Sequence, residues 1–198
     1  NLAVGVTNHL GHAFGVATYS SLPILSTKPI VFEQHAARTN MAQYTDILWE
    51  RDTIRVFNIH LASNHLKTDE VDQIIEAGNE SWKITRRWIR KLRNGYRNRV
   101  EQVKILREEI ERSPYPVIVC GDVNDVPVSY TYHTLSKGLK DAFLESGEWI
   151  GATYNGRLPL LRIDYILYSP TIKSAKFSII EQAFTDHFPI TCEMSLDE

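Results

Sequence analysis

Short runs in which apolar and polar residues alternate occur near both ends of the chain, and a helical period occupies much of the middle. The clearest alternation covers residues 53–61, and it places Asn58 and His60 together on one face of a strand. Arg51-Asp52 is the expected turn between this strand and the one before it. The pattern predicts strands over residues 15–20, 30–32, 41–49, 53–61, 117–120, 161–168, 175–180 and 190–196.

Helical character is predicted over residues 69–94 and again over residues 97–112, with Gly95 expected to interrupt the two segments. Pro114 and Pro116 end the second segment. A short helix is predicted over residues 129–135. Strands at both ends with a long helical stretch between them favour two packed sheets with helices outside, rather than a strictly alternating parallel sheet.

Composition adds few restrictions to this α/β interpretation. The 198 residues suit one domain, 43% are hydrophobic, and the formal net charge of −2 indicates no particular partner. Cys120 and Cys192 both lie in apolar runs, so we expect two buried free thiols rather than a disulfide or a metal site. No apolar run approaches the roughly 20 residues that a membrane-spanning helix needs.

Residues 117–127 form the stretch around which the remaining segments are expected to gather. A short buried strand ends at Gly121, and Asp122 and Asn124 follow two positions apart, so they point the same way if the chain stays extended. An acid beside an amide suits a hard cation or a phosphate-bound nucleophile. The same residue types are also common in turns, so a turn and a functional site are both open interpretations.

Other strand ends offer further polar side chains, and each is a weak signal when taken alone. Together they could bind a divalent cation, orient a water molecule and supply a general base. A zinc site, a nucleophilic serine elbow, a P-loop and a dinucleotide fingerprint have no matching motif. The residues of this set are Asn58, His60, Asp122, Asn124, Asp164, Asp186 and His187.

Four of these segments, in this order, resemble successive motifs of the endonuclease/exonuclease/phosphatase superfamily, which has the DNase-I-like fold. Residues 127–132 are also similar to a bacterial branch of members whose substrates are often unknown. The resemblance implies a four-layer α/β/β/α sandwich, with two mostly antiparallel central sheets flanked by helices. The segments are Asn58-Ile59-His60-Leu61, Gly121-Asp122-Val123-Asn124-Asp125, Arg162-Ile163-Asp164-Tyr165-Ile166 and Thr185-Asp186-His187-Phe188-Pro189.

The resemblance also implies hydrolysis of phosphoester bonds with Mg²⁺ or Mn²⁺. Asp122 would orient or deprotonate the attacking water, and Asn124 would hold that water or a phosphate oxygen. Asp164 and His187 would form a dyad, and Asp186 would sit at or next to the metal. His60 would face the leaving group, while Asn58, Arg38 and Asn40 would be placed to contact substrate.

Family members also have an early strand that ends in Asn, followed by a Gln-Glu pair whose Glu is the main metal ligand. Neither feature occurs here, and Glu33-Gln34 is reversed and too late in the chain. We therefore expect residues 1–198 to be the C-terminal portion of a single domain with little activity by itself. Whether a membrane anchor or signal precedes it, and hence its cellular location, stays open.

Eight basic residues lie between positions 83 and 99, with no acid among them and with aromatic residues interspersed. One interpretation is a solvated helix face, and the other is contact with nucleic acid or with an anionic membrane surface. The basic segment slightly favours a nuclease. The alternatives are a lipid or sugar phosphatase of the same fold and a non-catalytic binding module.

Overall fold

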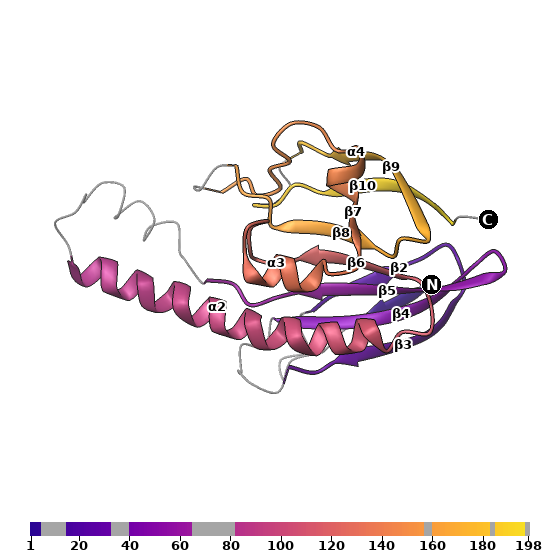
Figure 1. The fold of residues 1–198 in the computed structure, drawn as a ribbon, viewed down its shortest axis with the longest axis horizontal. Helices are drawn as coiled ribbons and strands as arrows, with labels where there is room; N and C mark the ends of the chain where they lie inside the picture. The colour runs from indigo at the N-terminus through magenta and orange to yellow at the C-terminus, as the bar shows by residue number, and fades with distance from the viewer. Residues whose placement is uncertain (5–14, 33–39, 65–81, 157–159, 183–184, 197–198) are drawn as a thin grey trace.

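The computed structural model describes residues 1–4, 15–32, 40–64, 82–156, 160–182 and 185–196. At its centre is a six-stranded sheet with the strand order β3-β4-β5-β6-β8-β7 (Figure 1). β5 and β6 run parallel, and the other neighbours run antiparallel. The strands are β3 (Ile24–Ile30), β4 (Met41–Trp49), β5 (Asp52–His60), β6 (Val117–Asp122), β7 (Lys140–Asp141) and β8 (Asp164–Tyr168).

Two antiparallel strand pairs and three helices complete the described fold. The long helix α2 runs along the central sheet, whereas α4, β9 and β10 gather at the opposite side of the molecule (Figure 1). The pairs are β1 (Leu2–Val4) with β2 (Ala17–Tyr19), and β9 (Ile172–Ile179) with β10 (Ile190–Leu196). The helices are α2 (Trp82–Glu111), α3 (Tyr130–Leu135) and α4 (Ala142–Ser146).

Apolar side chains cover both faces of the central sheet. Alternation along β6 directs Val119 toward α2, where it joins a core that includes Val103 and Leu106. Ile118 points the other way and packs with a second cluster formed largely by β9 and β10, including Phe177. A one-residue slip of β6 would exchange these faces, so burial on both sides fixes the register that positions the site.

The expected α/β class is confirmed, because the fold is mixed, with a large central sheet and helices. The strands at residues 41–49 and 190–196 begin and end where the alternation predicts. The strand expected over residues 30–32 is wrong, since β3 ends at Ile30 and includes Pro29. Proline is tolerated there because β3 lies at an edge of the sheet, where one side of the strand needs no ladder hydrogen bonds.

The expected interruption at Gly95 is also wrong, since α2 is continuous from Trp82 to Glu111. A Cβ atom at this position would lie 2.4 Å from Oδ1 of Asn64 and 3.2 Å from the carbonyl oxygen of Ser63. Glycine therefore allows the helix to pack closely against the segment that leaves β5, which offsets its poor helix propensity. Residues 69–81 of the first predicted helical segment lie outside the described residues.

Cys120 and Cys192 are free thiols, but both are half-buried rather than fully buried as expected. Burial raises the pKa of the Cys120 thiol to about 11, which keeps it protonated at neutral pH. Among the helices that the structure describes, none combines the length and the apolar character needed to cross a bilayer.

Candidate active site

The carboxyl-terminal ends of β5 and β6 lie beside the start of β8, at the same end of these neighbouring strands of the central sheet. The β5–β6 register pairs His60 with Asp122, and the β6–β8 register pairs Asp122 with Asp164. Neighbouring strands lie about 4.8 Å apart, so the three side chains form a row across the sheet. Nε2 of His60 lies 3.7 Å from Oδ2 of Asp122. Three distant segments of the sequence thus deliver their polar ends to one place.

The chain turns sharply at Asp122, and the turn holds its carboxylate. Asn124 adopts a left-handed backbone with φ of 54°, a conformation that asparagine tolerates better than most residues. Its backbone N–H donates to Oδ1 of Asp122, and its Nδ2 donates to Oδ2, both at 2.7 Å. The turn expected for this stretch is present, and it orients the Asp122 carboxylate. Its interpretation as a functional site stays a prediction.

His187 reaches this row from the loop before β10. Its Nδ1 lies 2.8 Å from Oδ2 of Asp164, and its Nε2 lies 4.0 Å from Oδ2 of Asp122. The ring of Tyr154 meets the His187 ring edge-on, with centroids 5.4 Å apart. The structure thus brings together five of the residues expected at the site, namely His60, Asp122, Asn124, Asp164 and His187, and adds an aromatic contact that the sequence did not indicate.

Residues 153–155 position both members of the Asp164–His187 pair. Oγ1 of the buried Thr153 accepts the backbone N–H of Asp164 at 3.1 Å, and its carbonyl oxygen accepts the N–H of Phe188. Tyr154 forms an isolated antiparallel bridge with His187. The glycine-rich composition of this region predicts only a loop, so no signal in the sequence distinguishes Thr153 and Tyr154 from other loop residues.

The surroundings raise the pKa values of two groups at this site. Burial, together with the nearby charge of Asp164, raises the pKa of the Asp122 carboxyl group to about 7. The hydrogen bond to Asp164 raises the pKa of His187 above its usual value. A carboxyl group with a pKa close to neutral pH is suited to exchange a proton with a bound water molecule.

Asp122, Asp164 and His187 could hold a divalent cation. One ligand atom from each of the three lies within 4.8 Å of the other two. Among the residues that the structure describes, these three form the group of His, Cys, Asp or Glu side chains that is close enough to hold a metal ion. Two carboxylates and an imidazole suit Mn²⁺, or Mg²⁺ with water molecules completing its shell. The donor set therefore fits the cation that the family resemblance implies.

The other predicted site residues do not all lie at the site. Asn40 joins the site indirectly, since its Nδ2 donates to the Leu61 carbonyl oxygen at 3.0 Å, the same oxygen that accepts from Asn124. Asn58 instead donates to the carbonyl oxygen of Ala17 in β2. Asp186 is exposed and does not belong to the described group of three possible ligands. Arg38 lies outside the described residues. The roles expected for these residues stay predictions.

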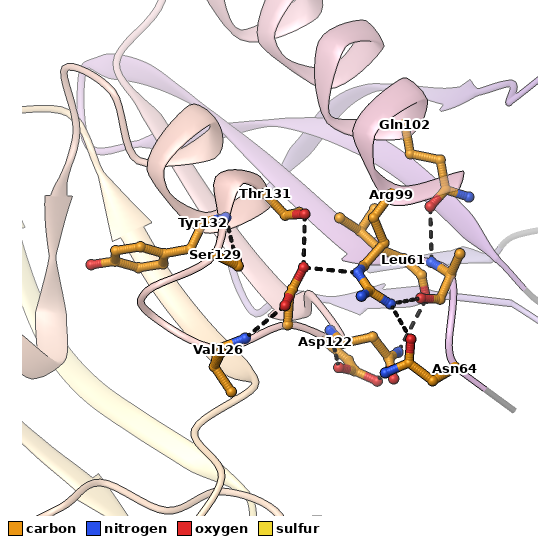
Figure 2. A network of polar contacts seen from close by, with 12 residues as sticks. Leu61, Asn64, Arg99, Gln102, Asp122, Val126, Ser129, Thr131 and Tyr132 are labelled. Carbon is orange, nitrogen blue, oxygen red and sulfur yellow. Dashed lines mark hydrogen bonds and ion pairs between the residues drawn. The ribbon is translucent and has the colours of Figure 1, made fainter. Parts of the chain in front are cut away.

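A buried polar network behind the site ties α2 to the turn after β6 (Figure 2). Arg99 donates through Nε to Asp125 at 3.0 Å and through Nη1 to the Ala62 carbonyl oxygen at 2.8 Å and to Asn64 at 3.0 Å. One turn along α2, Gln102 accepts the backbone N–H of Ala62 at 2.8 Å. These bonds hold the segment after β5, whose Leu61 carbonyl oxygen in turn anchors Asn124.

Arg99 therefore fits neither expectation for the basic segment, since its side chain is only 4% exposed and lies against Asp125. The sequence did not separate Arg99 from its exposed basic neighbours, because a charge run does not show which member faces inward. The Thr131 hydroxyl group donates to the Asp125 oxygen that Arg99 contacts, Oδ2, at 2.9 Å, and the backbone N–H of Val126 donates to Oδ1 at 3.1 Å.

Replacing Arg99 with methionine is expected to lower the free energy of unfolding by about 3 kcal/mol, because the partly buried Asp125 carboxylate loses its charged partner. Equilibrium unfolding in urea measures this change. Lys104→Met is the matched control on the same helix, since Lys104 and its partner Glu101 are about half exposed, and it should shift stability by less than about 1 kcal/mol. Equal losses in the two variants would show that the buried network does not stabilise the site.

Residues 3–187 match the Endonuclease/Exonuclease/phosphatase family. No curated protein sequence matches the chain. Similar solved structures include a Bacteroides thetaiotaomicron mannosyl-6-phosphatase, with 16% identity over 91% of this chain and 70% of that one and a TM-score of 0.63. D. rerio TDP2 complexed with a single-strand DNA product has 16% identity over 88% of this chain and 68% of that one, with a TM-score of 0.59.

A family protein from the same Bacteroides species has 17% identity over 91% of this chain and 67% of its own, with a TM-score of 0.63. At these identities the structures show a shared fold, and the family match carries the assignment. Because that match includes Asp122, Asp164 and His187 and spans most of the sequence, the chain belongs to the endonuclease/exonuclease/phosphatase family.

Proposed function

We propose that this protein is a divalent-cation-dependent phosphodiesterase that hydrolyses nucleic acid with an activated water molecule. Family membership supports a hydrolase of phosphoester bonds. The observation that carries the finer proposal is the Asp122 carboxylate, held by Asn124 and facing both His60 and the Asp164–His187 pair.

In this proposal Asp122 orients the attacking water and accepts its proton, and its raised pKa of about 7 suits that exchange at neutral pH. Asn124 holds the carboxylate in one orientation, which lowers the cost of reaching the reactive geometry. His187, hydrogen-bonded to Asp164 at 2.8 Å, places a positive charge beside the phosphate as negative charge develops. His60 donates a hydrogen bond on the leaving-group side.

In this proposal the Asp164 carboxylate would hold Mg²⁺ or Mn²⁺ with water molecules completing its shell, beside Asp122 and His187, which keep the proton-accepting and phosphate-contacting roles given above. A bound cation supplies neutralisation of phosphate charge and polarisation of the phosphorus–oxygen bonds. Because only two carboxylates contribute to the described group, we expect this protein to bind the cation weakly.

Nucleic acid is the favoured substrate class because the similar D. rerio structure is complexed with a single-strand DNA product. A sugar phosphatase is the second candidate, which the similar mannosyl-6-phosphatase favours. A lipid phosphatase is a further alternative, and a non-catalytic binding module is the alternative outside enzymes. The intact group around Asp122 argues against a purely binding role.

Incubation of the protein with single-stranded DNA and with a sugar phosphate, each with Mg²⁺, with Mn²⁺ or with a chelator, tests the proposal. We expect cation-dependent cleavage of the DNA to exceed release of phosphate from the sugar. Faster release of inorganic phosphate would identify a phosphatase. Tight binding of DNA without turnover of either substrate, even at high cation concentration, would identify a binding module.

A further inference from the structure

The amino-terminal half of α2 carries an exposed apolar stripe that the proposed chemistry does not use. Ile89, Leu92 and Tyr96 recur at spacings of three and four residues, which places them along one side of the helix. Their exposed fractions are 57%, 40% and 44%. The stripe extends about 10 Å along the helix axis. Large apolar side chains grouped in this way are typical of an interaction surface rather than of a solvated helix.

A row of exposed arginines runs directly beside this stripe. Arg90, Arg93 and Arg97 each follow one member of the stripe, so their row is rotated from it by about 100°. The sequence contains no Asp or Glu from residue 81 to residue 100. For Arg90 and Arg93, the helix itself therefore offers no carboxylate within four positions in either direction.

The carboxyl-terminal half of the same helix differs sharply. Lys104 pairs with Glu101 at 3.4 Å, and Arg112 pairs with Glu108 at 3.2 Å. Basic residues there are balanced by acids one turn away, as on an ordinary solvent-facing helix. The apolar stripe and the arginines that have no acid one turn away on the helix, Arg90 and Arg93, thus occupy the same half of α2.

We propose that the basic-apolar surface formed by Ile89, Leu92, Tyr96, Arg90, Arg93 and Arg97 docks onto an anionic lipid membrane. Guanidinium groups bind lipid phosphate and carboxylate groups, while the apolar stripe enters the boundary between headgroups and acyl chains. A nucleic acid would engage the arginines but leave Ile89 and Leu92 in water, since its bases stack on aromatic rather than aliphatic side chains.

The position of the surface gives the docking a consequence for the site. In Figure 1 the amino-terminal half of α2 projects beyond the central sheet. The same helix continues to Arg99, which binds the segment after β5 that anchors Asn124. A membrane bound to this surface would therefore hold the protein through the element that supports the site, although the docking itself does not depend on turnover.

Sedimentation with vesicles of phosphatidylcholine, alone or mixed with phosphatidylserine, tests the proposal. We expect binding only to the mixed vesicles, and binding that weakens as salt rises. The double variant Arg90→Gln/Arg93→Gln should weaken partitioning by on the order of twenty-fold, since each basic residue near the surface contributes roughly five-fold. Lys104→Gln/Arg112→Gln is the matched control and should bind as the original protein does.

The variant Ile89→Ser/Leu92→Ser should also lose affinity for the mixed vesicles, with an unchanged melting curve showing that its fold is intact. The proposal is wrong if the protein sediments with neither kind of vesicle. It is also wrong if the arginine variant and the Ile89→Ser/Leu92→Ser variant both bind the mixed vesicles as strongly as the original protein. It is equally wrong if the arginine variant loses affinity for single-stranded DNA while no vesicle binds, because the surface would then be a nucleic-acid interface. Turnover is not a readout, so failure of the proposed function leaves this test intact.

Discussion

Replacing Asp122 with asparagine is expected to lower kcat/KM for phosphodiester hydrolysis by roughly 10²–10⁴-fold, the range that removal of a positioned general base produces. Asparagine keeps the size of the side chain and can still accept the backbone N–H of Asn124, although its amide nitrogen cannot accept the hydrogen bond that Nδ2 of Asn124 donates to Oδ2; both bonds are 2.7 Å in the structure. Asparagine cannot accept a proton from water. Steady-state hydrolysis of a DNA substrate with a saturating cation measures the loss.

The same substitution is expected to stabilise the cation-free protein above neutral pH. The folded-state pKa of Asp122 is raised from 3.8 to about 7, so this group favours folding below its unfolded pKa, and that contribution is lost as pH rises through about 7. One pKa unit corresponds to about 1.4 kcal/mol, so the difference between the proteins should reach a few kcal/mol at pH 8. Urea unfolding with a chelator at a series of pH values measures it.

Asp52→Asn serves as a control, because Asp52 is an exposed carboxylate at the opposite end of β5. This variant should keep both the activity and the pH dependence of the original protein. Unimpaired hydrolysis by the Asp122→Asn variant would show that Asp122 is not the general base. A variant that loses activity and also loses stability at every pH would indicate a structural role for the carboxylate instead.

Sequence patterns predicted the site best where it is built on strands. Alternation along residues 53–61 directed Asn58 and His60 to one face, and β5 presents His60 beside Asp122. The Gly121-Asp122-Val123-Asn124 stretch showed a strand end and a turn together, and the structure contains both. These predictions succeed because a strand has a period of two, so the identity of one inward residue determines the direction of its neighbours.

Contacts made by loops and by long helices were less accessible to prediction. Thr153 supports Asp164 through its hydroxyl group, yet a threonine in a glycine-containing loop has no distinguishing pattern. Gly95 was expected to interrupt a helix, and its actual reason is the approach of Asn64 to α2. Arg99 faces inward, where it pairs with Asp125, a residue 26 positions away in the sequence. In each case the cause is a tertiary contact, which local propensity does not contain.

Gly121 illustrates a tertiary contact of this kind with a large expected effect. Its φ is +135°, and a Cβ atom there would lie 2.0 Å from the carbonyl oxygen of Ile59 and 3.0 Å from its carbonyl carbon. Both atoms belong to the backbone of β5, so no side chain can move to relieve the clash. Replacing Gly121 with alanine must either separate β5 from β6 or rotate the chain that leads into Asp122.

We therefore expect Gly121→Ala to lower the free energy of unfolding by on the order of 4 kcal/mol, a size reserved for backbone clashes and core disruption. Activity should fall as well, because the β5–β6 pairing sets the approach of His60 to Asp122, now 3.7 Å between Nε2 and Oδ2. Gly138→Ala is the control that shows the effect of a strained backbone without a steric clash. Gly138 also has a positive φ, of +74°, but a Cβ atom added there would have no neighbouring atom within 4 Å.

Gly138→Ala should thus cost only about 1–2 kcal/mol, the penalty of a left-handed backbone, and should leave activity unchanged. Urea unfolding and DNA hydrolysis measured on both variants make the comparison. If the two variants lose equal stability, the close approach of Gly121 to Ile59 does not govern the geometry of the sheet edge. If Gly121→Ala folds with full activity, the β5–β6 contact is not what aligns His60 with Asp122, and the origin of that alignment must lie in the turn at Asn124.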